Sequence, residues 1–218
     1  MVYFDGITDD EVSEMFCRLN NGKPLTTFEI TRVKMKSLEA VHEIAKHEIF
    51  GAALTESAIN KGIDAEVVIK SWLLMNEPNC SFDRKSLNVV APNIDITDEQ
   101  KAELETAYTR ILDSYNWIKV NTFDLKLANK IAKRIVTRTH LISIVPFAIQ
   151  SVDDGVSVDK FAKWLMTFYG GTRYVSISDD YNSAARDNTG SNASIRCRNT
   201  ALSNSYNAFF FGDEAETA

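Results

Sequence analysis

Basic side chains recur every four residues in one part of the second half of the sequence. They are Lys126, Lys130, Arg134 and Arg138. Residues four apart are neighbours on a helix surface, so this spacing predicts a continuous basic row on one helical face. A row of this kind can contact the phosphates of a nucleic acid or an acidic protein surface. It can also be a solvated face that pairs with acidic side chains elsewhere, and the spacing leaves both interpretations open.

The residues around this row predict which way it faces. Leu127, Ile131 and Ile135 form an adjoining apolar stripe that would occupy the core side of the same helix. Between residues 117 and 138 only Asp124 is acidic, although the chain as a whole carries a formal net charge of −6. We therefore expect the basic row on the solvent side of one helix.

A second candidate site is the turn-forming segment NNGKP at residues 20–24. The Asn-Gly pair can take left-handed backbone angles that end a helix, and Pro24 prevents the helix from continuing. Arg18, Asn20 and Lys23 place unused hydrogen-bond donors around this turn. The segment is either a helix-to-helix corner or a ligand-binding loop, and local physics favours the corner.

The histidines and cysteines do not predict a metal site or a catalytic set. His42 and His47 are five residues apart, which turns the second ring about 140° from the first, whereas a helical zinc pair needs a spacing of four. His140 is the only other histidine, and no Gly-rich phosphate loop occurs. The three cysteines are widely separated. We therefore expect no metal, no cofactor and no catalytic residues.

The hydrophobic periodicity predicts a mainly α fold. We expect a multi-helix orthogonal bundle with a loop-rich Ser/Gly/Asn segment before the last helix. Capping-box pairs predict helix starts at Thr8, Thr26 and Thr97. The second of these helices is expected to continue through Ile44, and Asp64 is expected to cap the next one.

The later elements follow from the same pattern. One long helical tract is predicted for residues 124–150, with a bend at Pro146. A short aromatic helix is predicted for 158–169, and a final helix for 194–211. The Gly/Ser/Asn/Asp-rich stretch between them predicts a loop with at most a short helix.

The segment 79–96 is the most loop-like part of the sequence and a possible subdomain boundary. It would divide an N-terminal helical subdomain, residues 1–78 with the NNGKP corner, from a C-terminal helical subdomain, residues 97–211. Residues 212–218 would form an acidic frayed tail.

The composition is that of a soluble globular protein. With 44% hydrophobic residues and a pI near 5.2, the chain is not a wholly basic nucleic-acid binder, although a local basic patch is allowed. The N-terminus has no secretory signal, and the longest apolar run, LISIVPFAI, is too short to span a membrane. We expect a reduced, cytoplasmic protein that does not contact membranes. Its oligomeric state does not follow from these features.

Residues 16–29 also resemble a known segment. The stretch FCRLNNGKPLTTFE is similar to the pattern F-x-R-[IL]-N-x-G-x-P-L-T-x-x-E of the ParB-like nuclease-associated family typified by the N-terminal domain of GmrSD-type restriction enzymes. The matching residues are Phe16, Arg18, Leu19, Asn20, Gly22, Pro24, Leu25, Thr26 and Glu29. The order of a helical half, a Ser/Gly/Asn-rich stretch and a last helix with arginines and aromatics is similar as well.

The resemblance implies the helical half of such a protein without its catalytic half. The family's Asp-Gly-Gln-Gln-Arg run is absent, since Asp5-Gly6 is followed by Ile7 and Asp154-Gly155 by Val156. It implies a non-catalytic module that binds nucleic acid, a protein or a nucleoprotein complex. Such a module, encoded by a phage or mobile element, could act as an inhibitor of a host defence complex. The alternative is a subunit of a split NTP-dependent nuclease whose catalytic half is a separate chain.

Overall fold

The computed structural model describes residues 26–77, 79–170 and 179–212, together with Thr8, Glu11 and Met15. Within these residues the chain forms twelve α-helices, one 3₁₀ helix and no strand, so the predicted mainly α multi-helix bundle is confirmed. The elements are α2 (Thr27–Lys34), α3 (Leu38–Ile44), α4 (Ile49–Ala53), α5 (Glu56–Ile59), α6 (Ile63–Asn76), α7 (Arg84–Val90), η1 (Ala91–Asn93), α8 (Asp98–Asn121), α9 (Leu125–Ile135), α10 (Arg138–Asp153), α11 (Val158–Gly170), α12 (Asp179–Arg186) and α13 (Asn192–Phe211).

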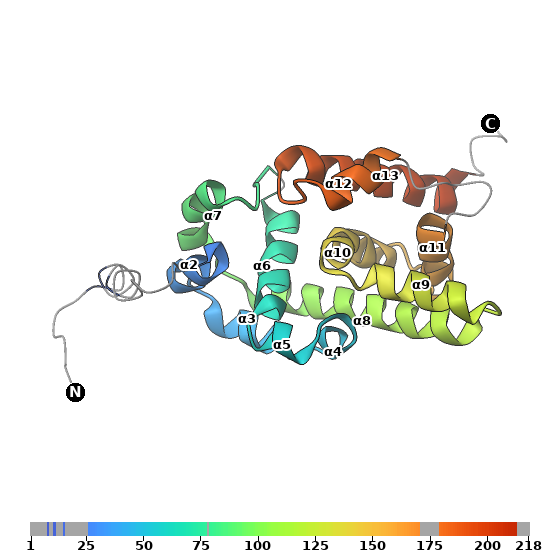
Figure 1. The fold of residues 1–218 in the computed structure, drawn as a ribbon, viewed down its shortest axis with the longest axis horizontal. Helices are drawn as coiled ribbons and strands as arrows, with labels where there is room; N and C mark the ends of the chain where they lie inside the picture. Colours follow the sequence, from blue (N-terminus) through green and yellow to red (C-terminus); the bar gives the residue numbers. More distant parts are fainter. Residues whose placement is uncertain are drawn as a thin grey trace.

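The central helix is α10, which packs against α6, α8, α9 and α13. Figure 1 shows it almost end-on, with α8 along one side of the molecule and α12 and α13 along the other. The side chains of Leu141, Ile144 and Val145 on this helix are buried. No single helix in the described part of the chain is both long and apolar enough to cross a membrane.

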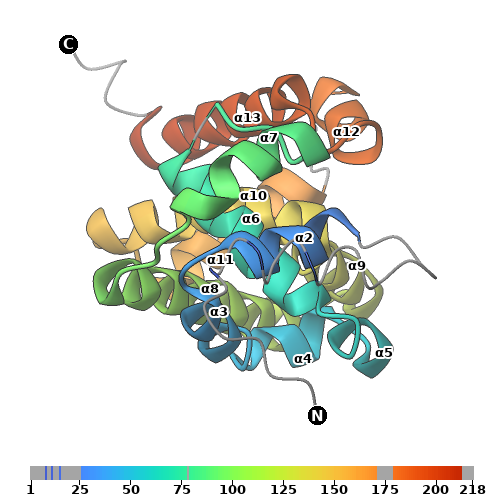
Figure 2. The ribbon, with the colours of Figure 1, turned by 90° about the vertical axis from the view of Figure 1, so that its left-hand side faces the viewer.

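The remaining helices close the two ends of the bundle. At one end α11 packs against α8, α9 and α13. At the other, seen face-on in Figure 2, α2 lies in front of α6 and packs against α7 and η1. Buried residues from Met35 to Tyr206 form one hydrophobic cluster, to which both predicted subdomains contribute. The division at 1–78 and 97–211 stays a prediction, and residues 213–218 of the predicted tail lie outside the described chain.

The predicted capping boxes are present. The Thr26 amide donates to Glu29 Oε2 at 2.6 Å and the Glu29 amide to Thr26 Oγ1 at 3.3 Å, and Thr97 and Gln100 make the same reciprocal pair at the start of α8. Thr8 and Glu11 make it as well. The predicted aromatic helix is α11, the predicted short helix is α12, and the predicted last helix is α13.

The predicted helix from Thr26 to Ile44 is wrong, because the chain breaks between α2 and α3. Met35 is extended and buried, and the next amide, of Lys36, donates to the Ile94 carbonyl at 3.2 Å. The Ser37 hydroxyl accepts from the Ile96 amide at 2.7 Å. These long-range hydrogen bonds replace the intrahelical ones that a continuous helix would require.

The segment 79–96 is not the loop that its asparagines and prolines predict. It contains α7 and η1. The Asp83 carboxylate accepts from the amides of Lys85 and Ser86 at 2.9 and 3.1 Å, so it caps α7, and Leu87 is buried. A good N-cap and one core contact therefore outweigh the weak helix propensity of the segment.

The residue that begins α6 is also different from the prediction. Gly62, with a φ of 71°, is the N-cap, and Asp64 lies inside the first turn. The Asp64 carboxylate accepts from the amide of Ala65 at 2.9 Å. A left-handed glycine turn, which the pattern of apolar residues does not reveal, sets this boundary.

The predicted helical tract 124–150 consists of two helices, α9 and α10, which meet at 82°. The break lies at Val136 and Thr137 rather than at Pro146, which is inside α10. Thr137 is extended, with a φ of −67° and a ψ of 145°, and its hydroxyl donates to the Arg134 carbonyl at 2.9 Å. The Thr137 side chain therefore provides a donor for a carbonyl at the end of α9, while the backbone turns toward α10.

Candidate functional site

The predicted basic row does not lie on one helix. Lys126, Lys130 and Arg134 belong to α9, whereas Arg138 is the first residue of α10. The prediction of four cations on one helical face is therefore wrong, because the break between the two helices turns the fourth away. The other predicted binding residues lie outside the described part of the chain: Arg18, Asn20 and Lys23.

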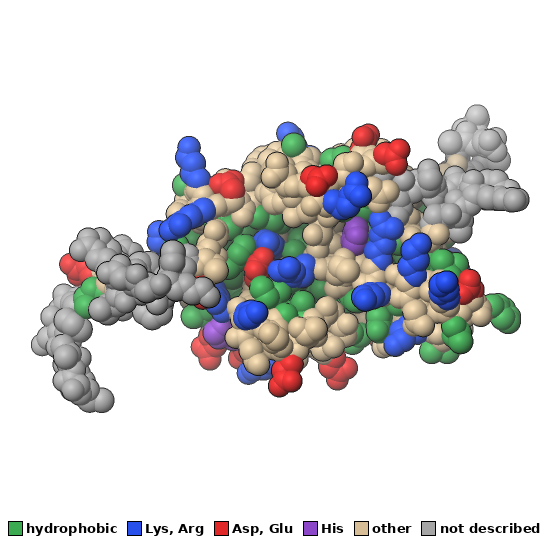
Figure 3. Space-filling model, in the orientation of Figure 1, with side chains coloured by type: hydrophobic (Ala, Val, Ile, Leu, Met, Phe, Trp, Pro, Cys, Tyr) green, Lys and Arg blue, Asp and Glu red, His purple; other side chains and the backbone are tan. Residues whose placement is uncertain are grey.

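Helix α9 presents three lysines to solvent. Its inner side is apolar as predicted, because Ile131 and Ile135 are buried and Leu127 is half-buried. The exposed lysines follow one another at intervals of four and three, so they share a face, and Figure 3 shows basic side chains gathered over α9. We call them the α9 lysine face: Lys126, Lys130 and Lys133. The predicted solvent orientation is confirmed for the first two.

The α9 lysine face has no acidic partner within the described residues. The ion pairs found there all involve other helices: Lys70–Glu66, Lys101–Glu43 and Lys163–Asp159. The nearest acidic residue in sequence, Asp124, accepts from the backbone amides of Lys126 and Leu127 at 2.9 and 3.0 Å and so caps the helix. Like charges at these spacings repel by about 0.2–0.5 kcal/mol per pair. An anionic ligand would relieve this repulsion.

Arg134 is held by the protein itself. Its Nη2 donates to Asn182 Oδ1 at 2.7 Å, and its guanidinium carbon lies 5.7 Å from the centre of the Tyr169 ring. These contacts join α9 to α11 and α12. Arg134 therefore positions α9 instead of presenting a mobile charge beside the lysines.

A buried polar chain connects α10, α11 and α12. His140 Nδ1 lies 2.8 Å from the Tyr181 hydroxyl, which lies 2.7 Å from the Tyr169 hydroxyl. Burial, and then the charges of Arg134 and Arg198, lower the pKa of His140 to about 3, while burial raises the pKa of Tyr181 to about 12. Both groups are neutral near pH 7 and far from the pKa of an efficient general acid or base. The chain therefore connects helices.

The two other histidines have local roles. His47 Nδ1 accepts from the Ile49 amide at 3.2 Å, and its Nε2 lies 3.1 Å from Thr109 Oγ1. Burial lowers the pKa of His47. His42 is exposed. Among the residues that the structure describes, no three His, Cys, Asp or Glu side chains lie together where they could hold a metal ion.

Large apolar side chains are exposed in the turn that leads into α9 and on the helical residues that flank it. Phe123 has a relative exposure of 107%, and Val120 and Leu125 are also exposed. An exposed aromatic ring next to cations is the combination that stacks on unpaired bases while lysines contact phosphates. Sequence reasoning missed these residues, because apolar periodicity assigns such side chains to the core.

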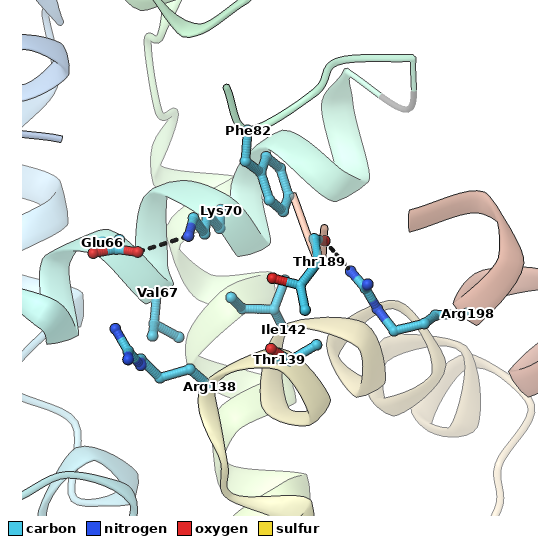
Figure 4. A pocket seen from close by; sticks show the side chains of 9 residues that line it. All are labelled: Glu66, Val67, Lys70, Phe82, Arg138, Thr139, Ile142, Thr189 and Arg198. Carbon is cyan, nitrogen blue, oxygen red and sulfur yellow. Dashed lines mark hydrogen bonds and ion pairs between the residues drawn. The ribbon is translucent and has the colours of Figure 1, made fainter. Parts of the chain in front are cut away.

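Arg138 lines a cavity of about 190 Å³ between α6, α10 and α13. Figure 4 shows Lys70 of α6 and Arg198 of α13 on its walls as well. Sequence reasoning did not group these three cations. No motif could have grouped them, because helix packing alone brings together residues so far apart in the chain.

Comparison of the chain with known protein families, with curated proteins and with solved structures finds no match. The α9 lysine face and the cavity at Arg138 are therefore the features from which its function is inferred. Both are basic in a chain whose formal net charge is −6. Such a separation of charge orients a protein toward anionic ligands.

Proposed function

We propose that this chain is a non-catalytic binding module that holds nucleic acid through the α9 lysine face. The main support for this proposal is that α9 presents three exposed lysines on one face, and none of them has an acidic partner among the described residues. Lys126 and Lys130 are separated by about 6 Å along the helix axis, which suits a ligand with regularly repeated charges. A polynucleotide backbone is such a ligand.

The exposed turn before α9 favours single-stranded over double-stranded nucleic acid. Phe123 precedes the first lysine by three residues and projects from the surface. In a duplex the bases are already stacked on each other, whereas an unpaired base has a free face for an aromatic ring. A protein partner with an acidic surface would contact the lysines, but it has no unpaired base that could stack on the ring of Phe123.

The resemblance of residues 16–29 to the GmrSD-type segment supports a place in phage defence. A module of this kind, encoded by a phage or mobile element, would interfere with a host defence complex by occupying its nucleic acid. The alternative, a split NTP-dependent nuclease, requires an Asp-Gly-Gln-Gln-Arg half in a neighbouring reading frame. Finding that half beside the gene would favour the alternative.

A salt titration tests the proposal. The full chain is titrated into a labelled single-stranded oligonucleotide, and the dissociation constant is measured by fluorescence anisotropy at several salt concentrations. In the Lys126→Gln/Lys130→Gln double variant we expect weaker binding and a log K against log[salt] slope that is smaller by about 1 for each lysine contacting a phosphate. The melting temperature should change little, because both side chains are exposed.

The matched control removes two lysines elsewhere. Lys34→Gln/Lys61→Gln changes the net charge equally, and both side chains are exposed at the α2 to α6 end of the molecule. The control should keep the wild-type slope. Equal losses in the two double variants would show that only net charge matters, and a wild-type chain that binds no oligonucleotide at low salt would exclude the proposal.

Phe123→Ser tests the choice of a single strand. Base stacking on an aromatic side chain contributes about 1–3 kcal/mol, so we expect roughly 5- to 150-fold weaker binding to the single strand. Binding to a duplex of the same sequence should change much less. Anisotropy with both probes measures the ratio, and an equal effect on the two would contradict stacking.

A further inference from the structure

The cavity between α6, α10 and α13 carries more positive than negative charge. Its charged side chains are Arg138, Arg198, Lys70 and Glu66, and Figure 4 shows Arg138, Lys70 and Glu66 on one side of the cavity and Arg198 on the other. Lys70 Nζ lies 2.6 Å from Glu66 Oε1. These two charges compensate each other, so the two arginines are in excess.

The arginine of α13 is a buried cation. Arg198 is only 2% exposed. Its Nε donates to Ser143 Oγ at 2.9 Å, its Nη1 to the Ala184 carbonyl at 2.6 Å and its Nη2 to the Thr189 carbonyl at 3.0 Å. All three acceptors are uncharged, and no carboxylate forms an ion pair with Arg198 among the described residues. A buried charge without a counter-ion is costly, so an anion in the cavity would stabilise it.

The lysine of α6 is fixed in place. Its ammonium lies 4.6 Å from the centre of the Phe28 ring and 5.5 Å from that of the Phe82 ring, in addition to its ion pair with Glu66. Cation–π contacts with two rings hold Lys70 at the cavity wall. Lys70 is therefore a preorganised cation whose charge Glu66 now neutralises.

Further donors surround the same space. Arg138 makes no hydrogen bond or ion pair with the described residues, and Thr139 and Thr189 line the cavity with hydroxyls that have no partner there. Arg138 and Thr139 also form the first turn of α10, whose N-cap, Thr137, makes no side-chain cap. Uncapped amides at a helix start favour an anion.

We propose that this cavity binds a phosphate group beside Arg138 and Lys70, with the buried charge of Arg198 on the opposite wall adding to the attraction. A volume of about 190 Å³ is below the roughly 300 Å³ at which pockets begin to hold whole drug-sized ligands, so a single phosphoryl group fits better than a nucleotide. The group is either free phosphate or the terminal monoester of a longer molecule. This site uses helices other than α9 and does not require the α9 lysine face.

Calorimetric titration of the full chain with inorganic phosphate tests the site. Wild type should bind phosphate saturably at one site. Arg138→Gln removes an exposed cation and should weaken binding at least tenfold, whereas Lys61→Gln, which removes an exposed cation between α5 and α6, should leave it unchanged. Glu66→Gln should tighten binding severalfold, because it removes the one carboxylate and leaves the charge of Lys70 to the ligand. A merely structural role of Glu66 predicts no such gain.

Oligonucleotides with and without a 5′-phosphate distinguish the two sources of the group. A preference for the phosphorylated strand that disappears in Arg138→Gln assigns the site to a strand end, and equal binding of both strands assigns it to free phosphate. Absence of saturable phosphate binding by wild type, or equal weakening by Arg138→Gln and Lys61→Gln, overturns the site. The salt slope set by Lys126 and Lys130 is a separate readout, so either proposal can fail alone.

Discussion

The His140 ring lies against Tyr169 and Tyr181, and its low pKa makes the fold sensitive to acid. Burial is the main cause of the shift to about 3, and two arginines add to it. An unfolded chain binds a proton at the ordinary value near 6.5, so between about pH 6.5 and pH 3 the unfolded state holds more protons. The stability contributed by the neutral ring is therefore fully present above pH 6.5. It is lost, by at most about 1.4 kcal/mol per pH unit, as the pH falls toward 3.

His140→Gln should flatten this dependence. The amide keeps a hydrogen-bonding group for Tyr181 but cannot take up a proton. Urea unfolding at a series of pH values from 7 to 4 measures the slope, and His42→Gln, on an exposed position, is the control for the loss of one histidine. An unchanged slope in His140→Gln would show that another group sets the acid sensitivity.

Some site residues could be predicted from the sequence and others could not. Lys126 and Lys130 were found because a local rule, spacing by four beside an apolar stripe, decides their exposure. Arg134 obeys the same rule, yet its partner Asn182 lies 48 residues further along the chain. Arg198 carries no local signal, because its burial is set by three segments that pack around it.

Among the helices, those with side-chain caps and strong apolar faces were predictable. α8 begins at a capping box, and α11 and α13 follow their apolar periodicity. The breaks at Met35 and Thr137 were not, because their backbone turns depend on distant carbonyls or on a hydroxyl that satisfies a helix end. The presence of a helix could therefore be predicted from the local sequence, whereas the residues at which it begins and ends required the tertiary structure.

Two glycines give a matched test of these boundaries. Gly62, at a φ of 71°, begins α6, and an added Cβ there would meet the Arg32 guanidinium, so Gly62→Ala should destabilise the fold by about 1–2 kcal/mol. Gly51 lies within α4, and nothing lies within 4 Å of an added Cβ. Gly51→Ala should be neutral or stabilising by up to about 1 kcal/mol. Chemical denaturation compares the two, and similar effects would contradict the left-handed turn at Gly62.

Across the whole molecule, positive charge is concentrated although the chain is acidic. Figure 3 shows basic side chains from α6 across to α9 on one face, while the chain carries a formal net charge of −6. A polyanion that approaches this face is attracted by these side chains. The charge distribution therefore steers a polyanion toward this face before any contact forms.

The contacts of Arg198 also have a consequence for biosynthesis. Chains generally begin to fold from the N-terminus while they are being translated. α8, α9 and α10 emerge before α13, so the lysines of α9 are available before Arg198 can join Ser143, Ala184 and Thr189. Ser143 of α10 therefore gains its contact with Arg198 only after α13 has been made.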